Sequence, residues 1–198
     1  MRARLQGLDE IAWHRTHPNN ASGADLPRLI RSVAAGNVHK FKLWDALLHQ
    51  GTRFGGAAEA LPFLIELASA DETPERPALV WLAAGVGAPV EEEARLRRLL
   101  CRGGELGWHG ALALGCLAEH RALSQESVDQ LAELLEHAVL VQRVAAACAL
   151  AFARSSDERV FDVLASTDEH FAELSRMRCR FEQPLMGMVA RACALMGE

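Results

Sequence analysis

One short stretch decides between the candidate folds: VAAACALA at residues 144–151 returns near the end of the chain as VARACALM at residues 189–196. Six of the eight positions are identical, at an offset of 45 residues. A third stretch, ALALG at residues 111–115, aligns with residues 147–151 at an offset of 36. Offsets of this size are typical of two-helix repeats, and small Ala and Gly residues at recurring positions let neighbouring helices approach closely. The pattern favours a helical-repeat protein, and the alternative is a chance likeness between buried Ala-rich helices.

The rest of the chain also favours helices over strands. Strand formers are scarce, because Tyr is absent and Ile occurs only at positions 11, 30 and 65. Ser, Thr and Asp mark helix starts, whereas Gly and Pro mark helix ends. Asp25, for example, precedes a helical pattern that Gly36 closes. These signals predict helices over residues 26–35, 38–50, 57–69, 75–85, 90–102, 107–119, 125–136, 139–154, 157–165, 168–178 and 184–197, with a short one near 4–12.

The segment 90–102 shows this logic most fully. Three glutamates, at positions 91 to 93, stand in its first turn, and three arginines, at 97, 98 and 102, stand toward its end. Both charge blocks suit the helix dipole, which favours acids at the start and bases at the end. We therefore assign the glutamates to helix stabilisation rather than to general acid–base chemistry.

Short linkers between consecutive helices make sequence neighbours antiparallel, which leaves helix bundles and α-solenoids as candidates. The internal repeats favour the solenoid. The predicted fold class is all-α, an α-solenoid of antiparallel two-helix HEAT-like repeats. We expect a single domain over residues 1–198, with an amino-terminal capping segment at 1–24 and about five helix pairs in 25–198.

Four motifs in the first part of the chain resemble those of bacterial HEAT-repeat domain proteins: LDEI at 8–11, DLP at 25–27, HQGTRF at 49–54 and ALPFL at 60–64. The resemblance covers roughly the first 90 residues by motif and the remainder by pattern. In that family the aromatic at the position of Phe54 is often Tyr. The resemblance implies a curved solenoid whose second helices line the concave side, and it implies interaction scaffolds with diverse partners. Fold alone does not give function.

Composition and charge exclude several classes of protein. Half of the residues are hydrophobic and 24% are charged, which is ordinary globular usage. A net charge of −5 argues against a protein that neutralises nucleic-acid phosphates, so nucleic acid is an unexpected partner. The amino terminus has no apolar signal segment, and the longest uncharged apolar run, at residues 78–90, is too short to span a membrane. We expect a cytoplasmic protein with no membrane association.

Cysteine usage fits the same compartment. The five cysteines are odd in number, widely spaced and mostly embedded in apolar segments. This is the pattern of reduced thiols, so no disulfide is expected. Cys101 and Cys148 lie among Leu and Ala, without an adjacent base to activate a thiolate. Inert thiols are the better interpretation for both.

Strong catalytic and cofactor signatures are absent from the sequence, including the Walker loop, the zinc-protease helix and the dinucleotide glycine fingerprint. His14 and His17, with Asp9 and Glu10 nearby, could supply metal ligands, but the turn Pro18-Asn19-Asn20 follows at once and no second cluster has ligand spacing. We expect no enzyme activity, no metal and no cofactor.

The candidate partner-binding residues are polar or amphipathic side chains on the predicted second helices. In the predicted helix 38–50, Lys42, Asp45 and His49 fall at i, i+3 and i+7 and form one polar stripe. If corresponding helices face the same way in each repeat, one side of the stack continues this stripe at the starts of later helices. The predicted site therefore contains Lys42, Asp45, His49, Arg53, Trp108, His109, Gln142 and Arg143. For Trp108 a place in the core is weighed against a place at the interface.

The predicted helices 107–119 and 139–154 raise a separate question, because after their first polar residues they are apolar on every side. Such helices are normally buried throughout. If one face were exposed instead, it would present an apolar groove for a partner or a second copy of the chain.

The leading hypothesis is a protein-interaction module that binds another protein, for instance a toxin-neutralising immunity protein, because an acidic surface suits a basic partner. Assembly of several copies of the chain into a homo-oligomer is a further alternative. The second class is a HEAT-like glycosylase that excises alkylated bases from DNA, which the negative charge disfavours. The third is a lyase or accessory factor of the HEAT-like type, on which the sequence is silent.

Overall fold

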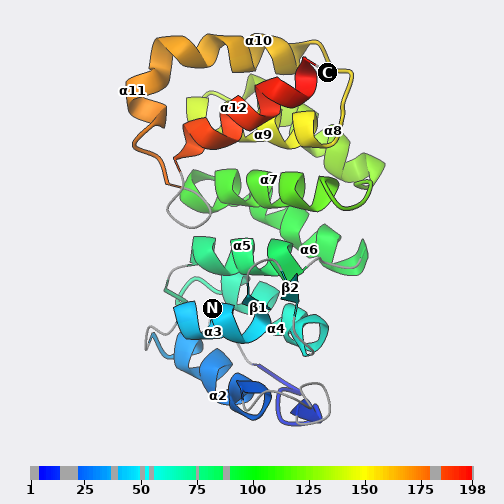
Figure 1. Cartoon of the computed structure of the whole chain (residues 1–198), viewed down its shortest axis with the longest axis vertical. Coiled ribbons are helices and arrows are strands. Elements are labelled where there is room, and N and C mark those ends of the chain that lie inside the picture. Colours follow the sequence, from blue (N-terminus) through cyan, green and yellow to red (C-terminus); the bar gives the residue numbers. More distant parts are fainter. Residues whose placement is uncertain are drawn as a thin grey trace. The chain divides into compact units, whose positions relative to one another are not determined.

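The structure is a computed structural model that describes residues 5–13, 22–36, 40–49, 52–53, 56–74, 76–86, 90–178 and 184–197 (Figure 1). The chain divides into two compact units, Met1–Glu92 and Glu93–Glu198. The single repeat domain over residues 1–198, with its capping segment at 1–24, therefore stays a prediction.

The first unit consists of helices and one very short β-ladder. Helix α2 packs against α3 and α4, and α4 packs along α5. The core of this unit includes the apolar side of α4, where Leu61, Leu64 and Ile65 are buried. The elements are α2 (Ser22–Ala34), α3 (Lys40–Leu47), β1 (Leu48–His49), β2 (Thr52–Arg53), α4 (Ala57–Ser69) and α5 (Arg76–Val86).

Helix α2 begins earlier than the sequence predicts. Asp25 was expected to cap a helix starting at residue 26, but the helix starts at Ser22 and Asp25 lies in its first turn. There its carboxylate forms an ion pair with Arg28, at 3.2 Å. An acid stabilises a helix both at the cap and throughout the first turn, so the residue type alone does not distinguish the two positions.

The predicted helix 38–50 is too long. Helix α3 ends at Leu47, and the next residues pair as a two-stranded antiparallel ladder, with Leu48 opposite Arg53 and His49 opposite Thr52. Leu48 is buried, and its side chain would clash with a Cβ atom at Gly85 on α5. The chain therefore leaves the helix where Leu48 packs on the adjacent helix, a tertiary contact that helical periodicity does not reveal.

The second unit is arranged around helix α9. Helices α7, α8, α10 and α12 all pack against α9, and residues 144–152 of α9 are buried throughout. Helices α10 and α11 lie at the edge of this unit, on the side of α9 away from α7 (Figure 1). The elements are α6 (Val90–Leu100), α7 (Gly104–Ala118), α8 (Gln125–Glu133), η1 (Leu134–Glu136), α9 (Leu140–Phe152), α10 (Arg159–Ala165), η2 (Ser166–His170), α11 (Phe171–Leu174) and α12 (Leu185–Met196).

Helices α7 and α9 approach each other closely at one glycine. A Cβ atom at Gly115 would lie 2.8 Å from the Cα atom of Ala149. Only a residue without a side chain fits there. Residues 106–117 of α7 are all buried, as is nearly all of α9 after its first turn. The alternative that these two helices form an exposed apolar groove is therefore wrong.

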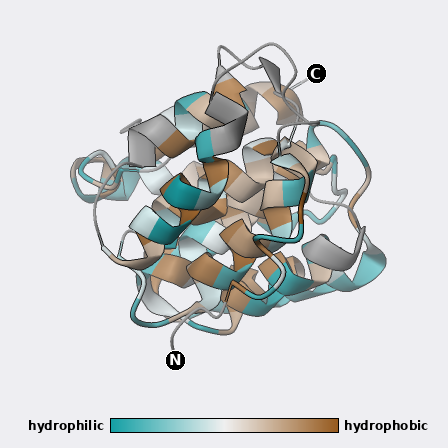
Figure 2. Cartoon of the chain, turned by 90° about the horizontal axis from the view of Figure 1, so that it is seen from below, coloured by the Kyte–Doolittle hydropathy of each residue, from teal (hydrophilic) through white to brown (hydrophobic). Residues whose placement is uncertain are grey.

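The helical fold class is confirmed, because helices account for nearly all the regular structure of the described residues. The predicted helix 168–178 is replaced by the end of the 3-10 turn η2 and the four-residue helix α11. Figure 2 shows both hydrophobic and hydrophilic residues on the helices, and several connecting segments are hydrophilic. Within the described residues, no helix is long and apolar enough to cross a membrane.

Candidate functional site

The predicted site residues of the first unit lie on α3 and the β-ladder. Asp45 is exposed on α3, as predicted. Lys42 lies on the same helix, whereas His49 and Arg53 belong to the two strands. The structure describes the backbone of Lys42, His49 and Arg53 but not their side chains. Because α3 ends before His49, the prediction that Lys42, Asp45 and His49 share one helical stripe is wrong.

The predicted site residues of the second unit form two pairs of sequence neighbours, one on α7 and one on α9, and most of them are buried. Trp108 is 5% exposed and His109 is 3% exposed, and their rings stack with centroids 3.6 Å apart. Gln142 is 2% exposed. The prediction that these three residues line a solvent-facing side is therefore wrong, and Trp108 belongs to the core.

The reason for this burial is that α7 starts three residues earlier than the pattern suggests. Gly103 and Gly104 both have positive φ, 65° and 54°, so the chain turns sharply after α6 and α7 begins at once. The Gln142 amide then reaches across and donates to the Gly104 carbonyl oxygen, at 2.8 Å. A Cβ atom at Gly107 would lie 2.8 Å from this amide nitrogen, so the glycine makes room for it. Gln142 is a structural contact between α7 and α9.

His109 is electrically neutral at physiological pH. Burial lowers the pKa of its imidazole to about 3, because the apolar surroundings disfavour the charged form. The Glu105 carboxylate is 3.8 Å away, but its side chain is 73% exposed. This carboxylate does not offset the burial, so the two residues do not form an ion pair near neutral pH.

Arg143 forms hydrogen bonds with the segment that precedes α9. Its guanidinium donates to the carbonyl oxygens of His137, at 2.8 Å, and Ala138, at 3.2 Å. These bonds hold the connection between η1 and α9. Arg143 therefore has a structural role that the sequence pattern did not indicate.

Replacing Arg143 by Ala should lower the free energy of unfolding by about 1 kcal/mol, because two carbonyl oxygens lose a donor. Urea denaturation followed by circular dichroism measures this change. The matched control is Arg98→Ala, an exposed arginine on α6, which should stay within about 0.5 kcal/mol of the wild type. Equal stability of the two variants would show that the Arg143 contacts contribute nothing.

Sequence reasoning missed a buried polar cluster at the start of α8. Glu93 is 1% exposed, whereas the charge pattern indicated only a favourable interaction with the helix dipole. Its carboxylate accepts from the Ser124 backbone N–H at 2.9 Å and hydroxyl at 2.8 Å, from the Ser127 hydroxyl at 2.6 Å, and from Arg121 Nη1 at 2.6 Å. Ser124 is also the N-cap of α8. Glu93 thus joins α6 to the amino-terminal end of α8.

The pKa of Glu93 reflects this arrangement. Burial alone would raise the pKa of the carboxyl, but the hydrogen bonds from Ser127, Ser124 and Arg121 outweigh burial and hold it below its usual value. The carboxylate is therefore charged and fully engaged. It is a structural anchor, because four hydrogen bonds, from Ser124, Ser127 and Arg121, hold it in place.

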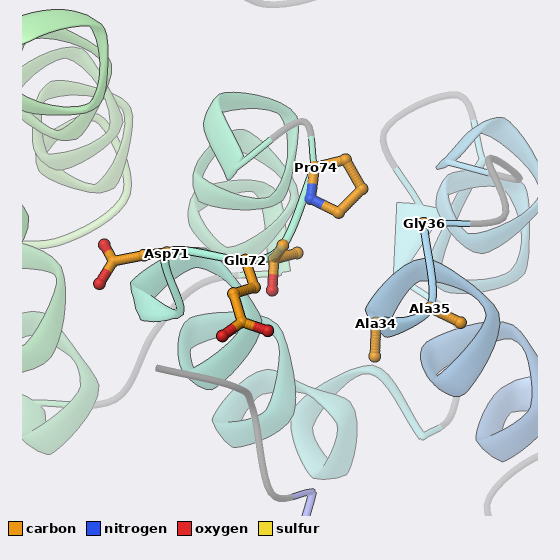
Figure 3. A pocket seen from close by; sticks show the side chains of 7 residues that line it. Ala34, Ala35, Gly36, Asp71, Glu72 and Pro74 are labelled. Carbon is orange, nitrogen blue, oxygen red and sulfur yellow. The ribbon is translucent and has the colours of Figure 1, made fainter.

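The first unit contains a pocket of about 680 Å³ between the end of α2 and the segment that connects α4 with α5 (Figure 3). Most of its lining is small or rigid. The Asp71 carboxylate forms an ion pair with Arg76, at 3.0 Å. The seven lining residues are Ala34, Ala35, Gly36, Asp71, Glu72, Thr73 and Pro74. This lining provides acceptor oxygens but neither a thiol nor an imidazole, so we assign no chemistry to it.

Metal binding finds no support among the residues that the structure describes. In these ranges no group of three or more His, Cys, Asp or Glu side chains could hold a metal ion. His14 and His17, the pair weighed as ligands from the sequence, lie outside the described residues. Cys101 is exposed and accepts a hydrogen bond from Gln130, whereas Cys148 is buried.

The most unusual surface feature lies on α10 and α11. Phe161 is 63% exposed and Phe171 is 56% exposed. The same segment packs inward through Val160, Leu164 and Leu174, which are buried. The two rings thus lie outside the core, although other apolar side chains of the same segment are buried in it. No motif in the sequence distinguished these phenylalanines from core residues.

Comparisons with known proteins name no relative: the chain matches no protein-family model, no curated protein and no solved structure. The resemblance to HEAT-repeat proteins therefore rests on the sequence motifs alone.

Proposed function

We propose that this chain is a protein-interaction module, built from antiparallel helix pairs of the HEAT type, that binds another protein through the outer surface of α10 and α11. A toxin-neutralising immunity protein is one form that such a module takes. The binding surface differs from the one that the sequence pattern favoured, because most of the latter's residues in the second unit are buried.

The packing of the second unit supports the repeat interpretation. The three similar stretches of sequence belong to α7, α9 and α12, and α9 packs against both of the others. Helices α8 and α10, which flank α9 in the sequence, also pack on it. In a helical-repeat protein, equivalent helices pack side by side in this way, with small residues at the contacts.

Exposed phenylalanine is the observation that carries the proposal. Burying a phenylalanine side chain typically stabilises a folded protein by about 2–3 kcal/mol. Two phenylalanines on the surface of one short segment do not contribute this stabilisation. Exposed apolar surface rimmed by polar residues marks interaction sites where it is contiguous, whereas single exposed apolar side chains are common. Aromatic residues also dominate the energetics of protein interfaces.

Replacing Phe161 and Phe171 together by Ser should abolish or strongly weaken partner binding while the fold remains intact. Interface anchors contribute about 2 kcal/mol or more each, so partner recovery should fall at least about tenfold. The measurement is quantitative mass spectrometry of proteins that co-purify with the tagged chain from its native host. The thermal midpoint should change little, because both side chains are more than half exposed.

The matched control replaces the same two residues by Leu, which keeps apolar side chains in place. This variant should retain the partner that the Ser variant loses. If the Ser variant recovers every protein as well as the wild type does, the partner uses another surface and the proposal is wrong.

A further inference from the structure

We infer that the α10–α11 surface binds a positively charged polypeptide segment that also carries apolar side chains. This inference rests on the proposed function and adds the chemistry of the partner. The surface is defined here by two aromatic and five acidic residues, all exposed: Glu158, Phe161, Asp162, Asp168, Glu169, Phe171 and Glu173.

The negative charge of the chain is concentrated on this segment. Residues 157–173 contain six acidic residues and a single basic one, Arg159, so their formal charge is −5. The whole chain also has a formal charge of −5. The other residues therefore sum to zero, so this segment has an excess of negative charge that a positively charged partner would meet at neutral pH.

The carboxylates of the α10–α11 surface are also unpaired. In the described part of the chain, none of its five acids forms an ion pair, whereas several acids elsewhere do, for example Asp71 with Arg76 and Glu126 with Arg97. Arg159 is bound to Asp157 and Glu136. The arginines that follow α11, at positions 176 and 178, make no ion pair with the five acids either. The charge on this surface is thus not neutralised by an ion pair among the described residues.

The two kinds of side chain alternate along the sequence of this segment. Phe161 is followed by Asp162, and Phe171 stands between Glu169 and Glu173. An arginine can satisfy both at once, because its guanidinium stacks on an aromatic ring while its N–H groups bind a carboxylate.

The second unit contains an internal example of this arrangement. The Arg191 guanidinium lies over the Phe152 ring, 5.5 Å from its centre, and forms an ion pair with Glu119. The α10–α11 surface also exposes rings and carboxylates, and in the described part of the chain no cation is paired with its five acids.

Charge also excludes the other occupants of such a surface. A second copy of the chain, meeting it through the same surface about a two-fold axis, would bring like charges together. Nucleic acid and anionic membranes would be repelled for the same reason. The acids are too dispersed for a metal ion, because the described residues hold no group of three potential ligands close enough together.

The test uses a fluorescently labelled peptide that alternates pairs of arginine and leucine, together with one peptide in which glutamate replaces each arginine and one in which lysine replaces it. Binding to the full chain is measured by fluorescence anisotropy at roughly 50 mM and 300 mM salt, because screening weakens ionic contacts at exposed sites. Both basic peptides should bind, with an affinity that falls as salt rises. The acidic peptide should not bind.

Two variants with the same net charge locate the site. The first, Asp162→Asn with Glu169→Gln and Glu173→Gln, removes three carboxylates of the α10–α11 surface. The second, Glu105→Gln with Asp129→Asn and Glu133→Gln, removes three exposed carboxylates elsewhere in the second unit. The first should weaken peptide binding about tenfold or more, and the second less than about threefold.

The outcomes separate this inference from the proposed function. If both variants lose affinity equally, attraction to the whole acidic chain explains the binding and the inference is overturned. If the acidic peptide binds as well as the basic ones and only the Phe161→Ser, Phe171→Ser variant loses it, the interaction module stands but the basic partner does not. Absence of any peptide binding, or self-association of the chain through these phenylalanines in sedimentation, also overturns the inference.

Discussion

Replacing Glu93 by Gln should lower the free energy of unfolding by about 3 to 5 kcal/mol, which is a large share of the stability of a small domain. The side chain keeps its size but loses its charge. Its amide oxygen cannot accept all the hydrogen bonds that the carboxylate takes from Ser124, Ser127 and Arg121. Its amide nitrogen would also place a donor against donors. Buried groups without partners are costly, so the variant is expected to unfold at a much lower urea concentration.

The control for Glu93 is a second Arg–Glu pair with the same separation. Arg121 and Glu93 are 2.6 Å apart, as are Arg97 and Glu126. The Glu93 side chain is 1% exposed, whereas that of Glu126 is 77% exposed. Because water screens the surface pair, Glu126→Gln should cost less than about 1 kcal/mol. If both variants lost the same stability, burial would not be the reason for the importance of Glu93.

Acid should also destabilise the protein through His109, by about 1.4 kcal/mol for each pH unit below 6.5. The imidazole has a pKa of about 3 in the folded chain and its ordinary value of 6.5 when unfolded. Between these values the unfolded state binds a proton that the folded state does not. The stabilising effect of the neutral imidazole is thus complete above pH 6.5 and is lost progressively as the pH falls toward 3.

Urea denaturation at pH 7.5 and pH 5.5 measures this effect in a window where most carboxyl groups stay charged. The wild type should lose roughly 1.4 kcal/mol over this interval. His109→Gln, which cannot take up a proton, should lose much less, whatever its absolute stability. His170→Gln is the control, because His170 is exposed and its removal should leave the pH dependence of the wild type unchanged. An unchanged slope in His109→Gln would contradict the assignment.

The helices could be predicted from the sequence because their signals are local. Apolar periodicity, together with Gly and Pro at helix ends, predicted α4, α6 and α9 within a few residues of their observed bounds. The similar stretches of sequence lie in α7, α9 and α12, and α9 packs against the other two helices. Each of these signals depends on residues that are close together in the chain.

The site could not be predicted in the same way, because exposure depends on residues that are distant in the sequence. His109 and Gln142 look like surface side chains in a list of polar positions. They are buried because α7 starts at Gly104 and Gln142 bonds to that residue's carbonyl oxygen. Phe161 and Phe171 look like core residues, but both are more than half exposed.

The sequence by itself determined the helical class, the approximate helix bounds and the net charge, because backbone preferences, capping and composition are properties of short segments. Only the tertiary structure decided which polar groups are structural and which surface is free. The same glutamate type is a buried anchor at position 93 and a solvated acid at position 169. The difference arises because burial removes water, and a buried charge is stable only where distant residues, here Arg121, Ser124 and Ser127, supply hydrogen bonds in its place.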